Sequence, residues 1–201
     1  MLPILEYLAV ISGASFGVLL ARTQRMDFVG AVCLAFIVAF GGGTLRDVLL
    51  DRSPLFWIAN EHYAWTVFGL AVVGSLPPRL PPRLQHWLNL PDALGLGLFS
   101  IVGAVIALEQ GTSPFIATLF GVITGTFGGV IGDIICNQVP NIFRPTIPLY
   151  ASCSFLGCWA FLGMRALGVE PGLAQGAAVA FIVALRMAAL RWNWMLPAAG
   201  E

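Results

Sequence analysis

"GGGTLRDVLLDRSP", residues 41–54, closes an otherwise apolar run with three glycines and four charged side chains. Residues 28–40, directly before it, carry no charge, which is typical of a helix inside a lipid bilayer. A charge at the bilayer centre costs at least about 2.5–3.5 kcal/mol, so Arg46 and Asp47 must face protein or water. The motif therefore predicts a polar interior within a membrane protein.

The composition points to the same class. Of 201 residues, 58% are hydrophobic and 10% are charged, against roughly 25% charged in soluble domains. The net charge is zero and all ten basic residues are arginines without a basic stripe, so no nucleic-acid partner is expected. No cofactor is expected either. Four cysteines within apolar segments, without a CxxC pair, are interpreted as small buried residues and not as metal ligands: Cys33, Cys136, Cys153 and Cys158.

A membrane-spanning helix needs about 20 mostly apolar residues. The sequence therefore predicts an all-α integral membrane protein with seven transmembrane helices, near residues 4–21, 28–50, 62–77, 91–109, 114–137, 147–164 and 172–191. Glu6 stands where a signal peptide would carry basic residues, so the first span is not expected to be cleaved. The proline-rich "PPRLPPRL" at 77–84 is expected to form an extended connector.

Arginines are distributed unequally between the two sides of these spans. One side carries Arg52 and Arg165, and the other carries Arg22, Arg25, Arg79, Arg83, Arg144 and Arg191. The positive-inside rule then places the N-terminus outside and the C-terminus in the cytoplasm. Arg186, inside the last span, is expected to reach toward the cytoplasmic interface.

The sequence also contains an internal repeat with an offset of 86 residues. "GGTLRDVLLDRSP" (42–54) aligns with "GGVIGDIICNQVP" (128–140), which places Asp133 opposite Asp47. Each copy holds three spans, an odd number, so the second must be inverted in the membrane. The predicted division is a first repeat with connector (1–90), a second, inverted repeat (91–165), and a seventh helix with the tail (166–201). Inverted repeats are typical of transporters, which bind substrate near the midplane at the repeat interface.

The glycines and charges of the two motifs are the candidate site. Each glycine lowers helix stability by about 1 kcal/mol relative to alanine, which predicts helix breaks or hinges at Gly41, Gly42, Gly43, Gly128 and Gly129. Close helix contact is the alternative. Residues four apart share a helix face, so the residues expected to line an aqueous cavity are Arg46, Asp47, Asp51, Asp133 and Asn137. Arg46 is expected to pair with Asp133 across the pseudo-twofold axis, because Asp47 points about 100° away around the helix.

With both motifs in view, the chain resembles the bacterial TRIC-like membrane proteins that carry the glycine-transporter domain. The resemblance rests on "FGGGTLRDVLLDRSP" and "GTFGGVIGDIICNQVPNIFRPTIPLYA" and covers about residues 5–165. It implies seven spans and a homotrimer in the bacterial inner membrane, with a pore in each protomer, conducting monovalent cations, mainly potassium, or transporting glycine. The family usually has arginine before the second aspartate, where this chain has Gly132. This departure predicts a cavity shifted toward negative charge, which favours cations.

The leading functional hypothesis is therefore a potassium channel, with membrane lipid and other copies of the chain as partners. Asp47 and Asp133 would attract cations, and Arg46 would gate them. The alternative is a carrier for glycine or another small zwitterion, and a remote one is a structural membrane subunit without transport. An intramembrane aspartyl protease is not expected, because Arg46 beside Asp47 opposes the shared proton that such a pair needs.

Overall fold

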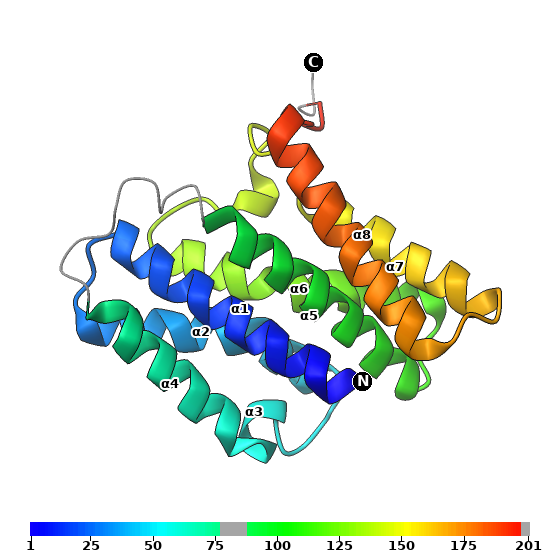
Figure 1. Cartoon of the computed structure of the whole chain (residues 1–201), viewed down its shortest axis with the longest axis horizontal. Helices are drawn as coiled ribbons and strands as arrows, with labels where there is room; N and C mark the ends of the chain where they lie inside the picture. The colour runs from blue at the N-terminus through cyan, green and yellow to red at the C-terminus, as the bar shows by residue number, and fades with distance from the viewer. Residues whose placement is uncertain (77–87, 198–201) are drawn as a thin grey trace.

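The computed structural model describes residues 1–76 and 88–197. The connector predicted at 77–84 lies outside the described residues. The described part holds eight α-helices and one short 3-10 helix, Asn141–Phe143 (Figure 1). The α-helices are α1 (Leu2–Thr23), α2 (Phe28–Leu49), α3 (Phe56–Ala59), α4 (Glu61–Ser75), α5 (Asn89–Glu109), α6 (Pro114–Ile135), α7 (Ala151–Ala166) and α8 (Pro171–Trp192).

The prediction of an all-helical membrane protein is confirmed. Five helices, α1, α2, α5, α6 and α8, are long and apolar enough to cross a bilayer. The other two predicted spans correspond to α4 and α7, which have 15 and 16 residues. Helix α3 lies in a segment that the sequence suggested was a joint, and it was not predicted.

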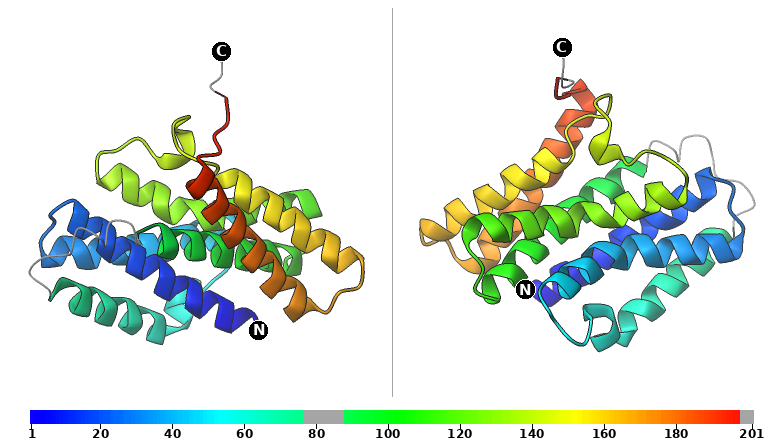
Figure 2. Two further views of the ribbon diagram at one scale, coloured as in Figure 1. Left: turned by 45° about the horizontal axis from the view of Figure 1, so that its top comes forward. Right: turned by 180° about the vertical axis from the view of Figure 1, so that it is seen from behind.

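Helix α5 forms the centre of the fold. It contacts α6, α1, α8 and α7. Within its 18-residue apolar stretch 78% of the residues are buried, against 39–56% in the corresponding stretches of the other four long helices. Figure 2 shows α1, α2 and α4 on one side of α5 and α7 and α8 on the other. One apolar cluster joins α5 to α1, α2 and α4, and a second joins it to α7 and α8. The buried helix α5 thus separates two halves, each with its own apolar core.

Three long helices begin with a side chain that accepts a hydrogen bond from the backbone. Asp27 accepts from the Gly30 amide at the start of α2, and Ser113 accepts from the Ile116 amide at the start of α6. These two caps differ by 86 residues, the offset of the sequence repeat. Glu170 caps α8, and hydrogen bonds from the backbone amides there lower its pKa, so it stays charged next to the positive end of the helix dipole.

Candidate functional site

The motif glycines lie where α2 crosses α6. A Cβ added at Gly42 would collide with the carbonyl oxygen of Thr124, and one added at Gly128 would collide with that of Val38. The two collisions are equivalent, because Val38 and Gly42 become Thr124 and Gly128 when 86 is added. The glycines therefore allow the two helix backbones to touch, as small residues do in membrane bundles.

The prediction of helix breaks at these glycines was wrong. Helix α2 is helical without interruption through Gly41, Gly42 and Gly43, and α6 through Gly128 and Gly129. The backbone hydrogen bonds within a lipid-embedded helix outweigh the weak helix preference of glycine, because no water is available to replace them. The alternative interpretation, close helix contact, holds for Gly42 and Gly128, whereas a hinge role for the motif glycines stays a prediction.

Asp47 sits at the C-terminal end of α2 and is fully buried. Its Oδ1 accepts hydrogen bonds from Arg46 Nε and Arg52 Nη1, both at 2.8 Å. Its Oδ2 accepts from the backbone amide of Phe56 at 2.8 Å. Both carboxylate oxygens are thus used, and the bond to Phe56 attaches the start of α3 to the end of α2.

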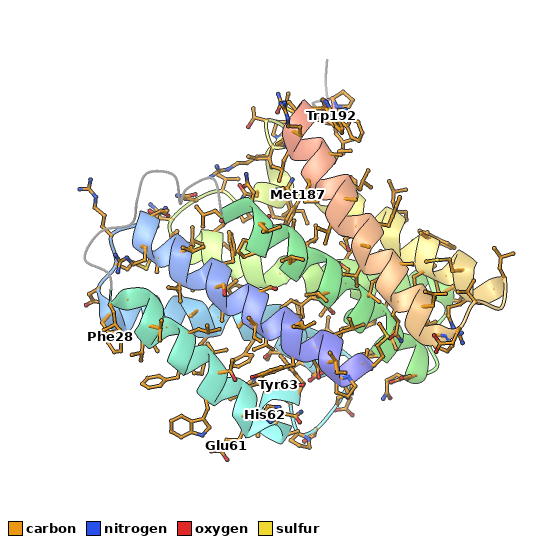
Figure 3. All side chains as sticks on the ribbon, viewed as in Figure 1. Phe28, Glu61, His62, Tyr63, Met187 and Trp192 are labelled. Atoms are coloured by element: carbon orange, nitrogen blue, oxygen red, sulfur yellow. The ribbon has the colours of Figure 1, made fainter. Side chains whose placement is uncertain are left out.

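Arg46 is also fully buried and has two further partners. Its Nη2 lies 3.4 Å from Glu6 Oε1 on α1, and its Cζ lies 5.2 Å from the centre of the Phe56 ring. Its Nη1 has no hydrogen-bond partner among the described residues. Tyr63, 2% exposed and directed toward α1 (Figure 3), faces Glu6 from α4. We call these residues, Glu6, Arg46, Asp47, Arg52, Phe56 and Tyr63, the first charge cluster.

The predicted pair between Arg46 and Asp133 does not form. Helices α2 and α6 cross near Phe40 and Thr126, midway between the glycine contacts. Arg46 lies six residues beyond Phe40 and Asp133 lies seven beyond Thr126, toward opposite ends of the pair. At 1.5 Å per residue they are roughly 20 Å apart along the helices. The arginine side chain instead bends back to its neighbour Asp47, which the 100° separation around the helix does not prevent.

Asp133 lies at the end of α6 in a simpler environment. Its Oδ2 accepts a hydrogen bond from the Asn141 amide at 2.9 Å, so it attaches the 3-10 helix as Asp47 attaches α3. No salt bridge to Asp133 is present within the described ranges. The two motif aspartates therefore share a structural role, and they differ in their arginine partners.

Asp51 and Asn137 do not share a helix face with these aspartates. Both are exposed, and both lie beyond the end of their helix with positive φ, 52° and 55°. The amides of Arg52 and Gln138, one residue further on, donate to the carbonyls of Asp47 and Asp133 at 2.8 and 2.9 Å, which closes each helix end. Residues four apart share a face only within a continuous helix, and α2 and α6 end before Asp51 and Asn137.

A second charge cluster, which the sequence did not predict, lies in the other half. Arg186 on α8 is 4% exposed and places its Nη2 3.5 Å from Asp92 Oδ2 on α5. Its Nη1 donates to the carbonyls of Pro148 and Leu149 at 2.8 and 2.9 Å, and its Cζ lies 4.7 Å from the ring centre of Tyr150. Tyr150 Oη donates to Asp92 Oδ1 at 3.0 Å. We call Asp92, Tyr150 and Arg186 the second charge cluster.

This second cluster corrects the expectation for Arg186. Arg186 does not reach toward the interface, because two carbonyls and a carboxylate bind it inside the protein. Asp92, near the start of α5, is bound by the same arginine and by Tyr150. The second half therefore contains a buried arginine, although position 132 carries a glycine. The sequence contained a sign of this cluster, because the repeat offset of 86 residues aligns Glu6 with Asp92, which is also acidic.

Three cavities lie beside this cluster. A mouth of about 460 Å³ is lined by residues 141–145, 147–152, Leu196 and Pro197. Next to it, a cavity of about 10 Å³ is lined by Asp133, Asp92 and Gly129, among others, and one of about 20 Å³ extends to Thr124 at the helix crossing. Each of the two smaller cavities has room for about one water molecule. Tyr150 lines all three cavities.

No group of three or more histidine, cysteine or carboxylate side chains suitable for a metal ion occurs in residues 1–76 and 88–197. The four cysteines are free thiols, and the expectation that all are buried holds for Cys153 and Cys158 but not for the half-buried Cys136 or the exposed Cys33. The site is therefore built from fixed charges, backbone carbonyls and aromatic rings.

Asp133→Asn is expected to destabilise the protein by less than about 1 kcal/mol, because the amide oxygen of asparagine can still accept from Asn141. The same change at Asp47 removes the negative charge between Arg46 and Arg52, and the single amide oxygen cannot accept from both the arginines and the Phe56 amide, so it is expected to cost about 3 kcal/mol or more. Thermal unfolding of the two purified variants in one detergent gives the comparison. Equal losses would contradict the unequal environments described for the two aspartates.

The family model described as "Glycine transporter" matches residues 3–76 and 89–166, most of the chain. The chain belongs to this family. A membrane protein of Vibrio cholerae is 36% identical over 182 residues, covering 90% of this chain and 75% of the relative. The inner membrane protein YadS of Escherichia coli is 35% identical over 186 residues, covering 90% of this chain and 87% of the relative.

Solved structures have the same fold. The structure of the TRIC trimeric intracellular cation channel orthologue from Rhodobacter sphaeroides matches with a TM-score of 0.89 at 35% identity, covering 96% of this chain and 98% of the other. A structure described for conductance through TRIC cation channels matches with a TM-score of 0.88 at 28% identity, over 99% and 97% of the two chains. The resemblance stated from the two motifs is confirmed. Family and fold are those of a non-enzymatic membrane protein, as predicted.

Proposed function

We propose that the protein is a channel for monovalent cations, mainly potassium, with one path through each protomer. The observation that carries the proposal is the match to the Rhodobacter sphaeroides TRIC cation channel over almost the whole of both chains. The cavities support it, because a mouth at one end of the bundle leads toward the carboxylates of Asp133 and Asp92. Carboxylates at a narrow entrance attract cations and repel anions.

The proposed path continues from these cavities to the crossing of α2 and α6 and then to the first charge cluster. The cavity at the crossing is lined by Thr124, Gly128 and Phe99, and it has room for about one water molecule. At its far end the proposed path meets the fully buried side chains of Arg46 and Asp47. In this arrangement the glycines bring α2 and α6 together, so that conduction requires these helices to separate or to slide.

We propose seven spans, with α4 and α7 crossing as short helices, arranged as two inverted repeats and α8. Equivalent contacts at the offset of 86 support the repeat: the caps of α2 and α6, the glycine contacts, and the closed helix ends after Asp47 and Asp133. An odd number of spans leaves the termini on opposite sides, and the arginine count favours the C-terminus in the cytoplasm. The proposed location is the bacterial inner membrane, as in the name of the Escherichia coli relative. The proposed assembly is a homotrimer, as in the name of the Rhodobacter sphaeroides channel.

Potassium flux in proteoliposomes tests the function. Purified protein in vesicles with a potassium gradient is expected to dissipate the gradient and to give discrete single-channel steps in planar bilayers. Empty vesicles and vesicles with the Asp47→Ala variant serve as controls. Saturable exchange of glycine without potassium conductance would replace the channel by a carrier, and the absence of both activities would favour the structural subunit.

Transport of glycine or another small zwitterion is the second candidate, supported by the family description and by Arg46. The unpaired Nη1 of this buried arginine can bind a carboxylate, and Glu6 beside it can bind an ammonium group. Counterflow of labelled glycine in the same vesicles distinguishes the two. A carrier saturates with glycine and shows no unitary current.

A further inference from the structure

Arg186 and Arg46 have equivalent surroundings in the two halves of the protein. Glu6 on α1 and Asp92 on α5 are 86 residues apart, and each lies 3.4–3.5 Å from the Nη2 of a buried arginine. Each guanidinium also lies over an aromatic ring, and each acid faces a tyrosine, Tyr63 in the first half and Tyr150 in the second. Two unrelated ion pairs would not be expected to share all of these features.

The two arginines nevertheless come from different parts of the chain. Arg46 belongs to the repeated motif, whereas the equivalent position, Gly132, has no side chain and packs against Val38. Arg186 belongs to α8, beyond the end of the family match at residue 166. Its position in α8 is next to Met187, in the half that ends at Trp192 (Figure 3).

Arg186 also contacts the segment that separates the mouth from the inner cavities, which we call the wall. The wall consists of the residues that line both spaces, which are Tyr150, Asn141 and Ile142. Arg186 lies behind it, bonded to the carbonyls of Pro148 and Leu149 and to Asp92, and stacked on the Tyr150 ring. This one side chain therefore joins α8, α5 and the segment before α7 next to the residues that separate the mouth from the inner cavity.

We propose that Arg186 replaces the arginine missing at Gly132, acting as the fixed cation of the second half, and that it latches residues 148–150 across the inner end of the mouth. Arg186 is a positioning residue, because it acts through Tyr150 and Asp92 and does not itself line a cavity. Its effect on ions rests on the proposed channel function. The latch itself does not depend on the channel function, because it concerns only the mobility of residues 148–150.

Neutralising the two partners of the pair is expected to shift ion selectivity in opposite directions. Arg186→Gln leaves Asp92 unbalanced, so the potassium to chloride permeability ratio should rise, and potassium flux should increase roughly tenfold as the latch opens. Asp92→Asn leaves Arg186 unbalanced, so the ratio should fall. Reversal potentials across a KCl gradient give both ratios. A loss of folding alone would not produce opposite shifts.

Three more variants separate charge from structure. Arg191→Gln, at the exposed end of the same helix, should leave the ratio unchanged. Arg186→Lys keeps the charge but cannot bond both carbonyls and the carboxylate with a planar fork, so the ratio should be retained while flux rises. The double variant Gly132→Arg/Arg186→Gln should move the ratio back toward that of the unmodified protein. Gly132→Arg must displace Val38 Cγ2, 3.0 Å from the new Cβ, so the Arg186→Lys variant remains informative if the double variant does not fold.

Hydrogen–deuterium exchange of the full chain in detergent tests the latch independently of transport. The amides of Ile147 and of residues 149–153 are expected to exchange roughly tenfold faster in Arg186→Gln and faster in Arg186→Lys than in Arg191→Gln. Unchanged exchange and an unchanged permeability ratio in a folded Arg186→Gln protein would overturn the proposal. Faster exchange in a protein without any potassium flux would support the latch and reject the channel function.

Discussion

Replacing Asp47 by alanine is expected to destabilise the protein by about 3–5 kcal/mol and to abolish potassium flux, because it removes one side of a buried charge network. The change leaves Arg46 with only Glu6 as its ion partner, and it leaves the Phe56 amide without an acceptor. Arg52 loses its ion pair as well. Thermal unfolding of the purified protein and flux in vesicles measure the two losses.

Asp51→Ala is the matched control for this prediction. It removes the same side chain four residues further on, where the aspartate is exposed beyond the end of α2. Its positive φ favours glycine or aspartate over alanine, so a loss of about 1 kcal/mol is expected there, without loss of flux. If Asp51→Ala stopped flux and Asp47→Ala did not, the exposed aspartate would be the functional one.

Gly42→Ala is expected to cost about 3 kcal/mol or more, because the new methyl group meets a backbone carbonyl that cannot rotate away. Helices α2 and α6 would have to separate at their crossing, and the cavity near Thr124 would change with them. Unfolding temperature and flux are the measurements, and Gly128→Ala is expected to behave in the same way through the carbonyl of Val38.

Gly69→Ala on α4 is the control for the steric argument. Nothing lies within 4 Å of a Cβ added there, so the helix should become slightly more stable through the better helix propensity of alanine. An equal loss of stability in Gly42→Ala and Gly69→Ala would mean that helix contact is not the role of Gly42. If Gly42→Ala were more stable than the unmodified protein and its gating were altered, the result would instead support a hinge at Gly42.

Much of the fold was predictable because membrane helices are specified locally. Apolar runs placed the long helices within four residues of their observed ends, since lipid requires about 20 residues without charge. The repeated glycines and aspartates were found by alignment of the sequence with itself. The short α3 was missed, because its formation depends on the hydrogen bond from the Phe56 amide to Asp47, nine residues earlier.

The charge partners were not predictable in the same way. Helical periodicity gives the face on which a side chain lies, but it does not say which helix packs against that face. Arg46 was paired with Asp133 on the basis of symmetry, although the crossing of α2 and α6 at the glycines places the two at opposite ends. Asp92 and Arg186 are 94 residues apart in the chain, and no spacing rule connects them.

The sequence by itself determined that this is a helical membrane protein with a duplicated glycine and aspartate motif, because bilayer thickness and the absence of water act on each segment separately. Only the tertiary structure decided that the glycines join two unbroken helices and that the second half obtains its buried arginine from α8. A buried charge is stabilised by whichever opposite charge or carbonyl the packing brings within about 3–4 Å, and that depends on the arrangement of all the helices together.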